Sequence, residues 1–319
     1  MRDPDFLFTV LPAPALQRLK KIDMNCGLVY TSLQRFNHLQ PYSRYDHSLG
    51  VALLAWRFSE SKKIALASLF HDIATPAFSH VVDFMHEDHE TQEYTEGRTE
   101  AMIREDPVIR SFLEAQGIEL CEVSDYHLYP IADNESPKLS CDRLEYTLEN
   151  MVRYGIESAV FQKAAAQDLI VGENEEGEEE LVFQSEAIAE KFAMASVACG
   201  RIYSGAEDRY AMEMLAGLLK RAVETGVLSE ALLYAEEPRV IDALLKSPLK
   251  EDWLKYRRLH AVYETEDDGQ DVISVRAKKR YIDPYVKGKG RIRQLSSAFE
   301  ETVKAFMAED YSVKLKGEF

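Results

Sequence analysis

Hydrophobic residues recur every three or four positions along most of the chain, the pattern of helices that bury one face. Segments 48–58 and 62–72 are mostly apolar, so we expect these two helices to lie at the centre of the fold. Pro76 should end the second helix or mark the loop after it. The predicted helices cover residues 12–30, 48–58, 62–72, 96–119, 138–153, 186–201, 207–224, 229–246 and 294–307.

Two segments depart from the helical pattern. Residues 168–183 place short apolar runs on either side of an acidic, glycine-containing turn, which predicts a surface β-hairpin with a solvated tip at 173–180. Residues 271–286 are partly alternating and β-branched, which predicts one or two short strands. At least eight helices against these few strands predict a mainly α fold. We expect a core in residues 1–165 and, packed on it, a helical region in 166–319 that carries the hairpin and the short strands.

The composition is that of an ordinary globular protein, with 46% of the 319 residues hydrophobic and 29% charged. No apolar run reaches about 18 residues, so we expect no membrane span. The first residues lack a basic start followed by an apolar run, so we expect no signal peptide. The scattered cysteines, which we expect to be free thiols in a reducing cytosol, are Cys26, Cys121, Cys141 and Cys199.

The net charge of -17 limits the range of partners. A strongly acidic protein repels polyanions at long range, which argues against broad nucleic-acid binding. A small anionic substrate remains compatible, because a few arginines or lysines dominate the field within a Debye length of about 8 Å. Any phosphate site must therefore be locally basic.

Three short motifs carry candidate chemistry. His47 leads into one apolar helix, His71 and Asp72 stand at the end of the next, and Asp142 opens an amphipathic segment. Imidazole nitrogens and carboxylate oxygens together suit a divalent transition metal, and four such ligands leave positions for water and a phosphate oxygen. Neighbouring residues point about 100° apart on a helix, so His71 and Asp72 can share an ion only near a helix end. The break at Pro76 provides such an end.

Each motif alone has a simpler explanation. A histidine on an apolar helix is commonly a hydrogen-bonded core residue, and an adjacent His-Asp pair occurs by chance in many proteins. Asp142 could serve only as a helix N-cap, and Arg44 could form a surface ion pair with Asp46. The joint occurrence of the three motifs at the edges of apolar helices favours a shared metal site.

The motifs resemble those of the HD-domain metal-dependent phosphohydrolases, and among them the deoxynucleoside triphosphate triphosphohydrolase branch. Residues 16–22 are similar to the family's F-Q-R-L-R-x-I, and residues 44–50 to R-F-x-H-S-L-G. Residues 71–80 resemble H-D-I-G-H-G-P-F-S-H at identical length, residues 140–146 resemble D-A-D-R-x-D-Y, and residues 279–284 resemble a C-terminal strand segment. The resemblance implies an HD-domain helical core with a C-terminal helical extension.

The resemblance also implies roles for individual residues. Arg44 would contact a phosphate, where its fork allows bidentate binding. His80 and Asp83 match positions that line the catalytic cleft, and Arg143 and Tyr146 match positions that contact phosphate and sugar. For His80 and Tyr146, packing in the core is an equal alternative. The ligands of one divalent ion (Mn, Fe, Zn, Ni or Mg, with His/Asp ligation favouring a transition metal) would be His47, His71, Asp72 and Asp142.

Several positions depart from the family pattern. Thr75 replaces a histidine that reaches the phosphate in the triphosphohydrolases, and a threonine there carries no charge and moves no proton near neutral pH. Met24 and Asn150 stand where a glutamine and an aspartate often contact the sugar. These changes leave the four metal positions intact. The family's downstream His-Glu pair corresponds to His89-Glu90, to His86-Glu87, or is lost at Gln92-Glu93.

The sequence thus predicts a cytoplasmic hydrolase of EC 3.1 type that uses metal-activated water on a nucleotide phosphoester or phosphoanhydride, with a (deoxy)nucleoside triphosphate as one candidate. A non-catalytic nucleotide sensor is the main alternative because of Thr75. A di-iron oxygenase would need two further ligands, for which only His80, His86 and His89 lie nearby. A homo-oligomer is compatible with the family. The histidines that match no motif, and to which we assign structural positions, are His38, His127 and His260.

Overall fold

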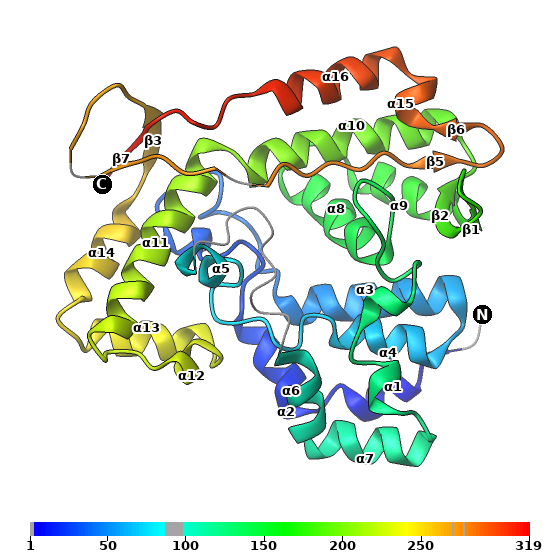
Figure 1. Ribbon diagram of the computed structural model, residues 1–319, viewed down its shortest axis with the longest axis horizontal. Helices are drawn as coiled ribbons and strands as arrows, with labels where there is room; N and C mark the ends of the chain where they lie inside the picture. Colours follow the sequence, from blue (N-terminus) through cyan, green and yellow to red (C-terminus); the bar gives the residue numbers. More distant parts are fainter. Residues whose placement is uncertain (1–2, 87–97, 270, 277) are drawn as a thin grey trace.

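The computed structural model describes residues 3–86, 98–269, 271–276 and 278–319, and its fold is mainly α, as predicted (Figure 1). The helices up to residue 168 are α1 (Phe6–Val10), α2 (Pro14–Arg18), α3 (Arg44–Ser59), α4 (Lys62–Phe70), α5 (Val81–Met85), α6 (Thr99–Glu105), α7 (Pro107–Gln116), α8 (Cys141–Arg153) and α9 (Ala159–Asp168). The later helices are α10 (Glu186–Tyr203), α11 (Ala206–Glu224), α12 (Glu230–Leu233), α13 (Glu237–Leu245), α14 (Lys250–Arg258), α15 (Ile292–Leu295) and α16 (Ser297–Ala308). Short 3-10 turns are η1 (Leu19–Lys21), η2 (Leu28–Tyr30), η4 (Leu120–Glu122) and η5 (Tyr126–Leu128).

Two small sheets accompany the helices. The first has the order β1-β2-β5-β6, in which β1 and β2 form the predicted antiparallel hairpin and β2 pairs in parallel with β5. The second has the order β3-β7-β4 with antiparallel pairing. The strands are β1 (Leu169–Glu173), β2 (Glu179–Phe183), β3 (Ala261–Glu264), β4 (Val272–Ile273), β5 (Tyr285–Val286), β6 (Gly290–Arg291) and β7 (Leu315–Glu318).

The acidic tip of the hairpin forms ion pairs with other parts of the chain, which the sequence does not predict. Glu180 is fully buried, and both of its carboxylate oxygens accept hydrogen bonds of 2.7 Å from Arg291. Lys138 forms ion pairs with Glu176 and Glu178. The prediction of a solvated tip is therefore wrong for Glu180, because its partner Arg291 lies 111 residues further along the chain and no local pattern reveals it.

Helix α3 packs against both α4 and α8 at the centre of the fold. A capping box between Ser43 and Asp46 starts α3 four residues before its predicted start. Ser140 caps α8 by accepting a hydrogen bond from the backbone N–H of Arg143. Asp142 therefore lies inside the first turn of α8, and the explanation of Asp142 as the N-cap is wrong.

Three of the predicted helices are interrupted, two of them at prolines. The described part of segment 96–119 contains α6 and α7, which are separated where Asp106 caps α7 just before Pro107. Segment 229–246 contains α12 and α13, with Pro238 in the first turn of α13. The predicted helix 12–30 is continuous only through α2 and η1, because the chain becomes extended at Ile22, with a φ of -122° and a ψ of 117°.

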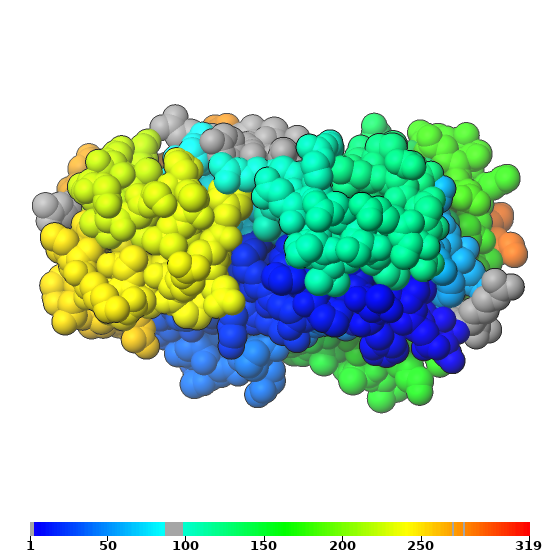
Figure 2. Space-filling model, turned by 90° about the horizontal axis from the view of Figure 1, so that it is seen from below, coloured from blue at the N-terminus to red at the C-terminus, as the bar shows by residue number. Residues whose placement is uncertain are grey.

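The hydrophobic interior forms three clusters. One cluster joins α1, α2, α4 and α7, a second joins α3, α8, α10 and α16, and the third joins α5, α11, α13 and α14. Figure 2 shows the N-terminal segment at the surface between the region of α6 and α7 and the region of α12 to α14. In the described ranges, every helix is too short or too polar to cross a bilayer.

The chain between β4 and β5 runs alongside α10 (Figure 1). A Cβ atom added at Gly200 of α10 would lie 2.0 Å from the backbone carbonyl oxygen of Arg280, so this close approach requires glycine. Ser196, one turn earlier, accepts a hydrogen bond of 3.0 Å from the backbone N–H of Ile282. Helix α10 thus fixes the position of the segment that carries Arg280.

We expect Gly200→Ala to destabilise the protein by about 2 kcal/mol or more, because the added methyl group forces the backbone at Arg280 away from α10. Gly217→Ala is the matched control. Gly217 is also helical, but nothing lies within 4 Å of its added Cβ, so alanine there should stabilise by about 0.5–1 kcal/mol. Urea unfolding of both variants tests this, and equal effects would contradict the assigned contact.

Candidate metal centre

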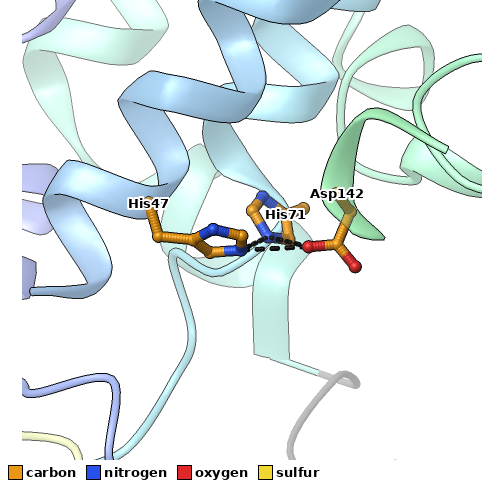
Figure 3. A group of neighbouring side chains, drawn as sticks. All are labelled: His47, His71 and Asp142. Carbon is orange, nitrogen blue, oxygen red and sulfur yellow. Dashed lines mark hydrogen bonds and ion pairs between the residues drawn. The ribbon is translucent and has the colours of Figure 1, made fainter. Parts of the chain in front are cut away.

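His47, His71 and Asp142 converge on one point from three separate elements (Figure 3). His47 lies in α3, His71 directly follows α4, and Asp142 lies in the first turn of α8. His47 Nε2 is 3.0 Å from Asp142 Oδ1 and 3.2 Å from His71 Nε2, and His71 Nε2 is 3.7 Å from Asp142 Oδ1. The structure thus brings three of the four predicted ligands into one group.

The other nitrogen of each imidazole faces an acceptor. His47 Nδ1 lies 2.5 Å from Glu145 Oε2, and His71 Nδ1 lies 2.7 Å from the carbonyl oxygen of Ser68. When each Nδ1 donates its proton there, the two Nε2 lone pairs face each other beside Asp142. Lone pairs and a carboxylate at these distances repel unless a cation lies among them. The donor set therefore fits a divalent metal.

The pKa values of His47 and Asp142 also show that the cluster favours a positive charge. Burial by itself lowers the pKa of His47, but the carboxylates of Glu145 and Asp142 outweigh it and raise the pKa to about 10. Burial by itself raises the pKa of Asp142, but His47 and His71 outweigh it and lower the pKa to about 2. The cluster attracts a cation, which is a proton or a metal ion.

Asp72, the fourth predicted ligand, lies at the edge of this group. Its Oδ2 is 3.6 Å from His71 Nε2 and 3.9 Å from His47 Nε2, and it also accepts a hydrogen bond of 2.8 Å from Arg44. Thr75 donates to Asp72 Oδ1 at 2.9 Å, so the threonine orients this carboxylate. Burial raises the pKa of Asp72, but Arg44, His71 and His47 together outweigh it and hold the pKa well below its usual range. The ligand role of Asp72 stays a prediction.

Arg44 is buried, with 6% of its surface exposed, on the wall of the same cavity. Its Nη1 donates to Asp72, and its Nε donates to Ser79 Oγ at 3.0 Å. The explanation of Arg44 as the partner of Asp46 in a surface ion pair is therefore wrong, because Asp46 belongs to the capping box. The predicted contact of Arg44 with phosphate would use a guanidinium that already braces Asp72.

Arg143 and Tyr146 line the cavity from α8. Arg143 holds the preceding loop, since its Nη1 lies 2.9 Å from Asp133 Oδ1 and its Nε donates to the carbonyl oxygen of Lys138 at 2.7 Å. The ring of Tyr146 lies 6.4 Å from that of His47, centroid to centroid. Their contacts with phosphate and sugar stay predictions.

His80 and Asp83 form a pair beside the metal group. His80 lines the cavity, and its Nδ1 is 2.9 Å from Oδ2 of Asp83, which is fully buried. Burial lowers the pKa of His80 against the opposing effect of Asp83, and the charge of Arg44 lowers it further. His80 is therefore a neutral imidazole near pH 7, and Asp83 orients its ring. Among the described residues, His80 is the hydrogen-bond partner of the Asp83 side chain, so Asp83 acts on the site through His80.

The metal group, Arg44, His80, Arg143 and Tyr146 share one cavity of about 300 Å³. His127, which the sequence analysis assigns to a structural position, also lines it, with Nε2 3.4 Å from Asp133 Oδ2. Other wall residues that the sequence analysis did not single out for the site include Asp133, Tyr203, Asp208, Lys278 and Arg280. Among these, Arg280 lies in the segment 279–284 that resembles the family, whereas the others come from loops and helices that no motif marks.

The family's downstream His-Glu pair is not placed by the structure. Glu87, His89-Glu90 and Gln92-Glu93 lie outside the described residues. His86 is the C-cap residue of α5.

Residues 44–140 match the family model of the HD domain. The chain contains an HD domain. It is 28% identical over 282 residues to the uncharacterized protein YdhJ of Bacillus subtilis (strain 168), and the alignment covers 87% of this chain and 82% of that protein. It is 25% identical over 159 residues to the metal-dependent phosphohydrolase cns2 of Cordyceps militaris, which covers 47% of this chain and 41% of that protein.

The fold of nearly the whole chain has a counterpart in one solved structure. A crystal structure of a phosphohydrolase (BT4208) from Bacteroides thetaiotaomicron VPI-5482 superposes with a TM-score of 0.65 and covers 99% of this chain and 98% of that one. The two sequences are 17% identical, so this likeness concerns the fold alone.

Glu145 supports the metal group through His47. Its Oε2 faces His47 Nδ1 and accepts a hydrogen bond from the hydroxyl of Tyr42. Its side chain occupies the space beside Gly50, where an added Cβ would lie 2.5 Å from Glu145 Oε1. Glu145 also borders a larger groove of about 520 Å³ along α3, α8 and α9, but that groove holds none of the three ligands. The position of Glu145, three residues after Asp142 on α8, was a signal available in the sequence.

Glu237 of α13 braces the loop of the HD domain that follows His71. Glu237 is 1% exposed and accepts hydrogen bonds from the backbone N–H groups of Asp23 at 3.0 Å and Phe78 at 3.2 Å, and from the Tyr30 hydroxyl at 2.6 Å. Phe78 and Ser79 have φ values of 62° and 54°, left-handed conformations that cost energy for residues other than glycine. The bond to Phe78 therefore helps to hold Ser79 against Arg44.

We expect Glu145→Gln to weaken metal binding by about 10- to 100-fold, because a neutral amide orients His47 less firmly and withdraws a negative charge from the cluster. Glutamine keeps the shape beside Gly50. Competition with a fluorescent chelator measures the affinity. Glu149→Gln, one turn further along α8, is the control and should bind metal as the parent does; unchanged affinity in Glu145→Gln would refute the assigned support.

We expect Glu237→Gln to change how stability depends on pH. Burial raises the pKa of Glu237 to about 7, while the bond from Tyr30 opposes the shift. A folded pKa above the unfolded value of 4.5 means that the stabilising contribution is complete below that value and is lost as the pH rises through 7. Relative to Glu237→Gln, the parent should therefore lose on the order of 3 kcal/mol between about pH 4.5 and pH 8.

Urea unfolding at a series of pH values measures this difference. The exposed Glu230→Gln is the control and should leave the pH dependence unchanged. A parallel pH dependence in the parent and in Glu237→Gln would show that Glu237 does not titrate as its burial implies.

Proposed function

We propose that this chain is a metal-dependent phosphohydrolase that cleaves a phosphoester or phosphoanhydride bond of a nucleotide, with (deoxy)nucleoside triphosphates among the candidate substrates. The observation that carries the proposal is the convergence of two imidazole Nε2 atoms and the Asp142 carboxylate on the wall of a cavity. The HD-domain match and the name of the Cordyceps relative support the same reaction class.

His47, His71 and Asp142 would hold the ion, with Asp72 as the carboxylate next to them. A divalent cation in such a site supplies Lewis acidity toward a phosphoryl oxygen and increases the acidity of a coordinated water. Glu145 and the carbonyl oxygen of Ser68 accept hydrogen bonds from the two Nδ1–H groups, which leaves both Nε2 atoms available for the ion. Both imidazoles are therefore already oriented for an ion, which would take the place of the proton that the cluster otherwise attracts.

His80 is our candidate for proton transfer. Because its Nδ1 is engaged by Asp83, its Nε2 is the nitrogen that remains to accept a proton from water or return one to the leaving group. The lowered pKa of His80 keeps that nitrogen unprotonated near pH 7. Arg44 contributes fixed positive charge beside Asp72, where a phosphate group would need it.

A nucleotide suits the composition of the cavity wall. The wall carries four basic side chains and four aspartates, so its charges balance despite the net charge of -17 of the chain, and a divalent metal at the ligand group would supply the local positive charge that a phosphate site needs. Tyrosine rings on the same wall offer apolar surface for the sugar or the base.

We expect the purified protein to contain about one divalent metal per chain and to release phosphate or polyphosphate from nucleotides in the presence of Mn²⁺. Asp142→Ala should lose both the metal and the turnover while its circular dichroism stays that of a helical protein. The control Glu149→Ala, on the same helix, should retain both. Metal analysis and phosphate release from a nucleotide panel measure the two properties.

Other outcomes would replace this proposal. Nucleotide binding by thermal shift without turnover of any substrate would favour a sensor that lost its chemistry at Thr75. Two iron atoms per chain would favour the oxygenase alternative. Turnover that persists in Asp142→Ala would place the reaction elsewhere.

A further inference from the structure

His127, in the 3-10 turn η5, lines the cavity close to the metal group. The ring of Tyr126 lies between the two, since its centroid is 5.1 Å from that of His71 and 4.4 Å from that of His127. Half of the His127 side chain is exposed, so the imidazole is not packed into the core. His127 is therefore accessible to a ligand in the cavity.

Each ring nitrogen of His127 faces a carboxylate. Nδ1 lies 3.0 Å from Asp125 Oδ1, which also accepts a hydrogen bond from the backbone N–H of His127 and so fixes the ring to its own turn. Nε2 lies 3.4 Å from Asp133 Oδ2, which is farther than an ordinary hydrogen bond. Only a doubly protonated imidazole can donate on both sides, so this geometry accommodates an imidazolium whose Nε2–H is held loosely.

Asp133 is itself held by the start of α8. Its Oδ1 lies 2.9 Å from Arg143 Nη1 and accepts a hydrogen bond of 3.1 Å from the hydroxyl of Ser140, the N-cap residue of α8. The first turn of the same helix carries the ligand Asp142. The carboxylate that faces His127 Nε2 is therefore fixed relative to the metal group.

His80 and His127 adjoin the metal group at different places. His80 lies beside Arg44, which bonds to Asp72 at the edge of the group. His127 lies beside the start of α8, the helix that supplies Asp142. In an in-line displacement at phosphorus, water attacks at one end and the leaving oxygen departs at the other. Two imidazoles placed in this way suit the two proton transfers that such a displacement needs.

We propose that His127 is the acid that protonates the leaving-group oxygen, while His80 accepts the proton of the attacking water. The inference deepens the proposed function and rests on it for the reaction class. As the water oxygen bonds to phosphorus, its proton moves to His80 Nε2. The bond from phosphorus to the leaving oxygen breaks, its electron pair stays on that oxygen, and the Nε2 proton of His127 moves there. Solvent then returns a proton to His127 and removes one from His80.

The test compares two substrates that differ only in the leaving group, the p-nitrophenyl and the phenyl ester of thymidine 5′-monophosphate, with Mn²⁺ present. p-Nitrophenolate departs readily without a proton, whereas the more basic phenolate needs one. We expect His127→Ala to lower kcat at least about 100-fold on the phenyl ester and less than about tenfold on the p-nitrophenyl ester. His260→Ala is the control, because His260 is also half-exposed beside a carboxylate but lies outside the cavity wall, and it should keep both rates.

Metal content and urea unfolding provide readouts that do not depend on turnover. His127→Ala should contain as much metal as the parent and unfold at the same urea concentration, because the exposed His127 belongs neither to the ligand group nor to the core. An equal loss of rate on both esters, an unchanged rate on the phenyl ester, or a loss of metal would each overturn the proposal.

The proposed function is tested separately by phosphate release from the nucleotide panel. A parent that hydrolyses both esters, while His127→Ala loses both rates equally, keeps the hydrolase and loses the role of His127. A parent that cleaves neither ester also overturns the role of His127, and the nucleotide panel then decides the hydrolase alone.

Discussion

Three side chains that repel one another in the absence of a cation are held within 3.0–3.7 Å, and much of the surrounding structure serves this arrangement. The packing of α3 against α4 and α8 brings His47, His71 and Asp142 together. Ser68 and Glu145 then set the orientation of the two imidazoles. Such a cluster costs folding energy in the free protein, and the cation that it binds offsets this cost.

Residues within short helical motifs could be predicted from the sequence, because their placement depends on local periodicity and caps. This applies to His47, which lies near the start of α3, and to His71, which follows the end of α4. It also applies to the hairpin of β1 and β2. Asp142 was singled out by the joint occurrence of the three motifs, and the resemblance to the HD-domain family supported its ligand role, because no local rule connects it to the histidines. The division into a core of residues 1–165 and a C-terminal region stays a prediction.

Features that depend on distant partners could not be predicted. Arg44 was expected on a phosphate or at the surface, whereas its bond to Asp72 arises only when the end of α4 meets α3. The buried Glu180 depends on Arg291, and Asp208 reaches the cavity only because α11 packs beside the aromatic wall. Sequence periodicity reports which face of a helix is buried, but it does not report what that face contacts.

The crossing at Gly200 connects the cavity to a distant part of the chain. The family match covers residues 44–140 and includes both histidines, whereas Lys278 and Arg280 reach the cavity from a segment that α10 positions more than a hundred residues later. A substitution in that late segment would alter the cavity wall while leaving the three grouped side chains in place. A single glycine thus keeps two parts of the wall, one inside and one outside the family match, in register with each other.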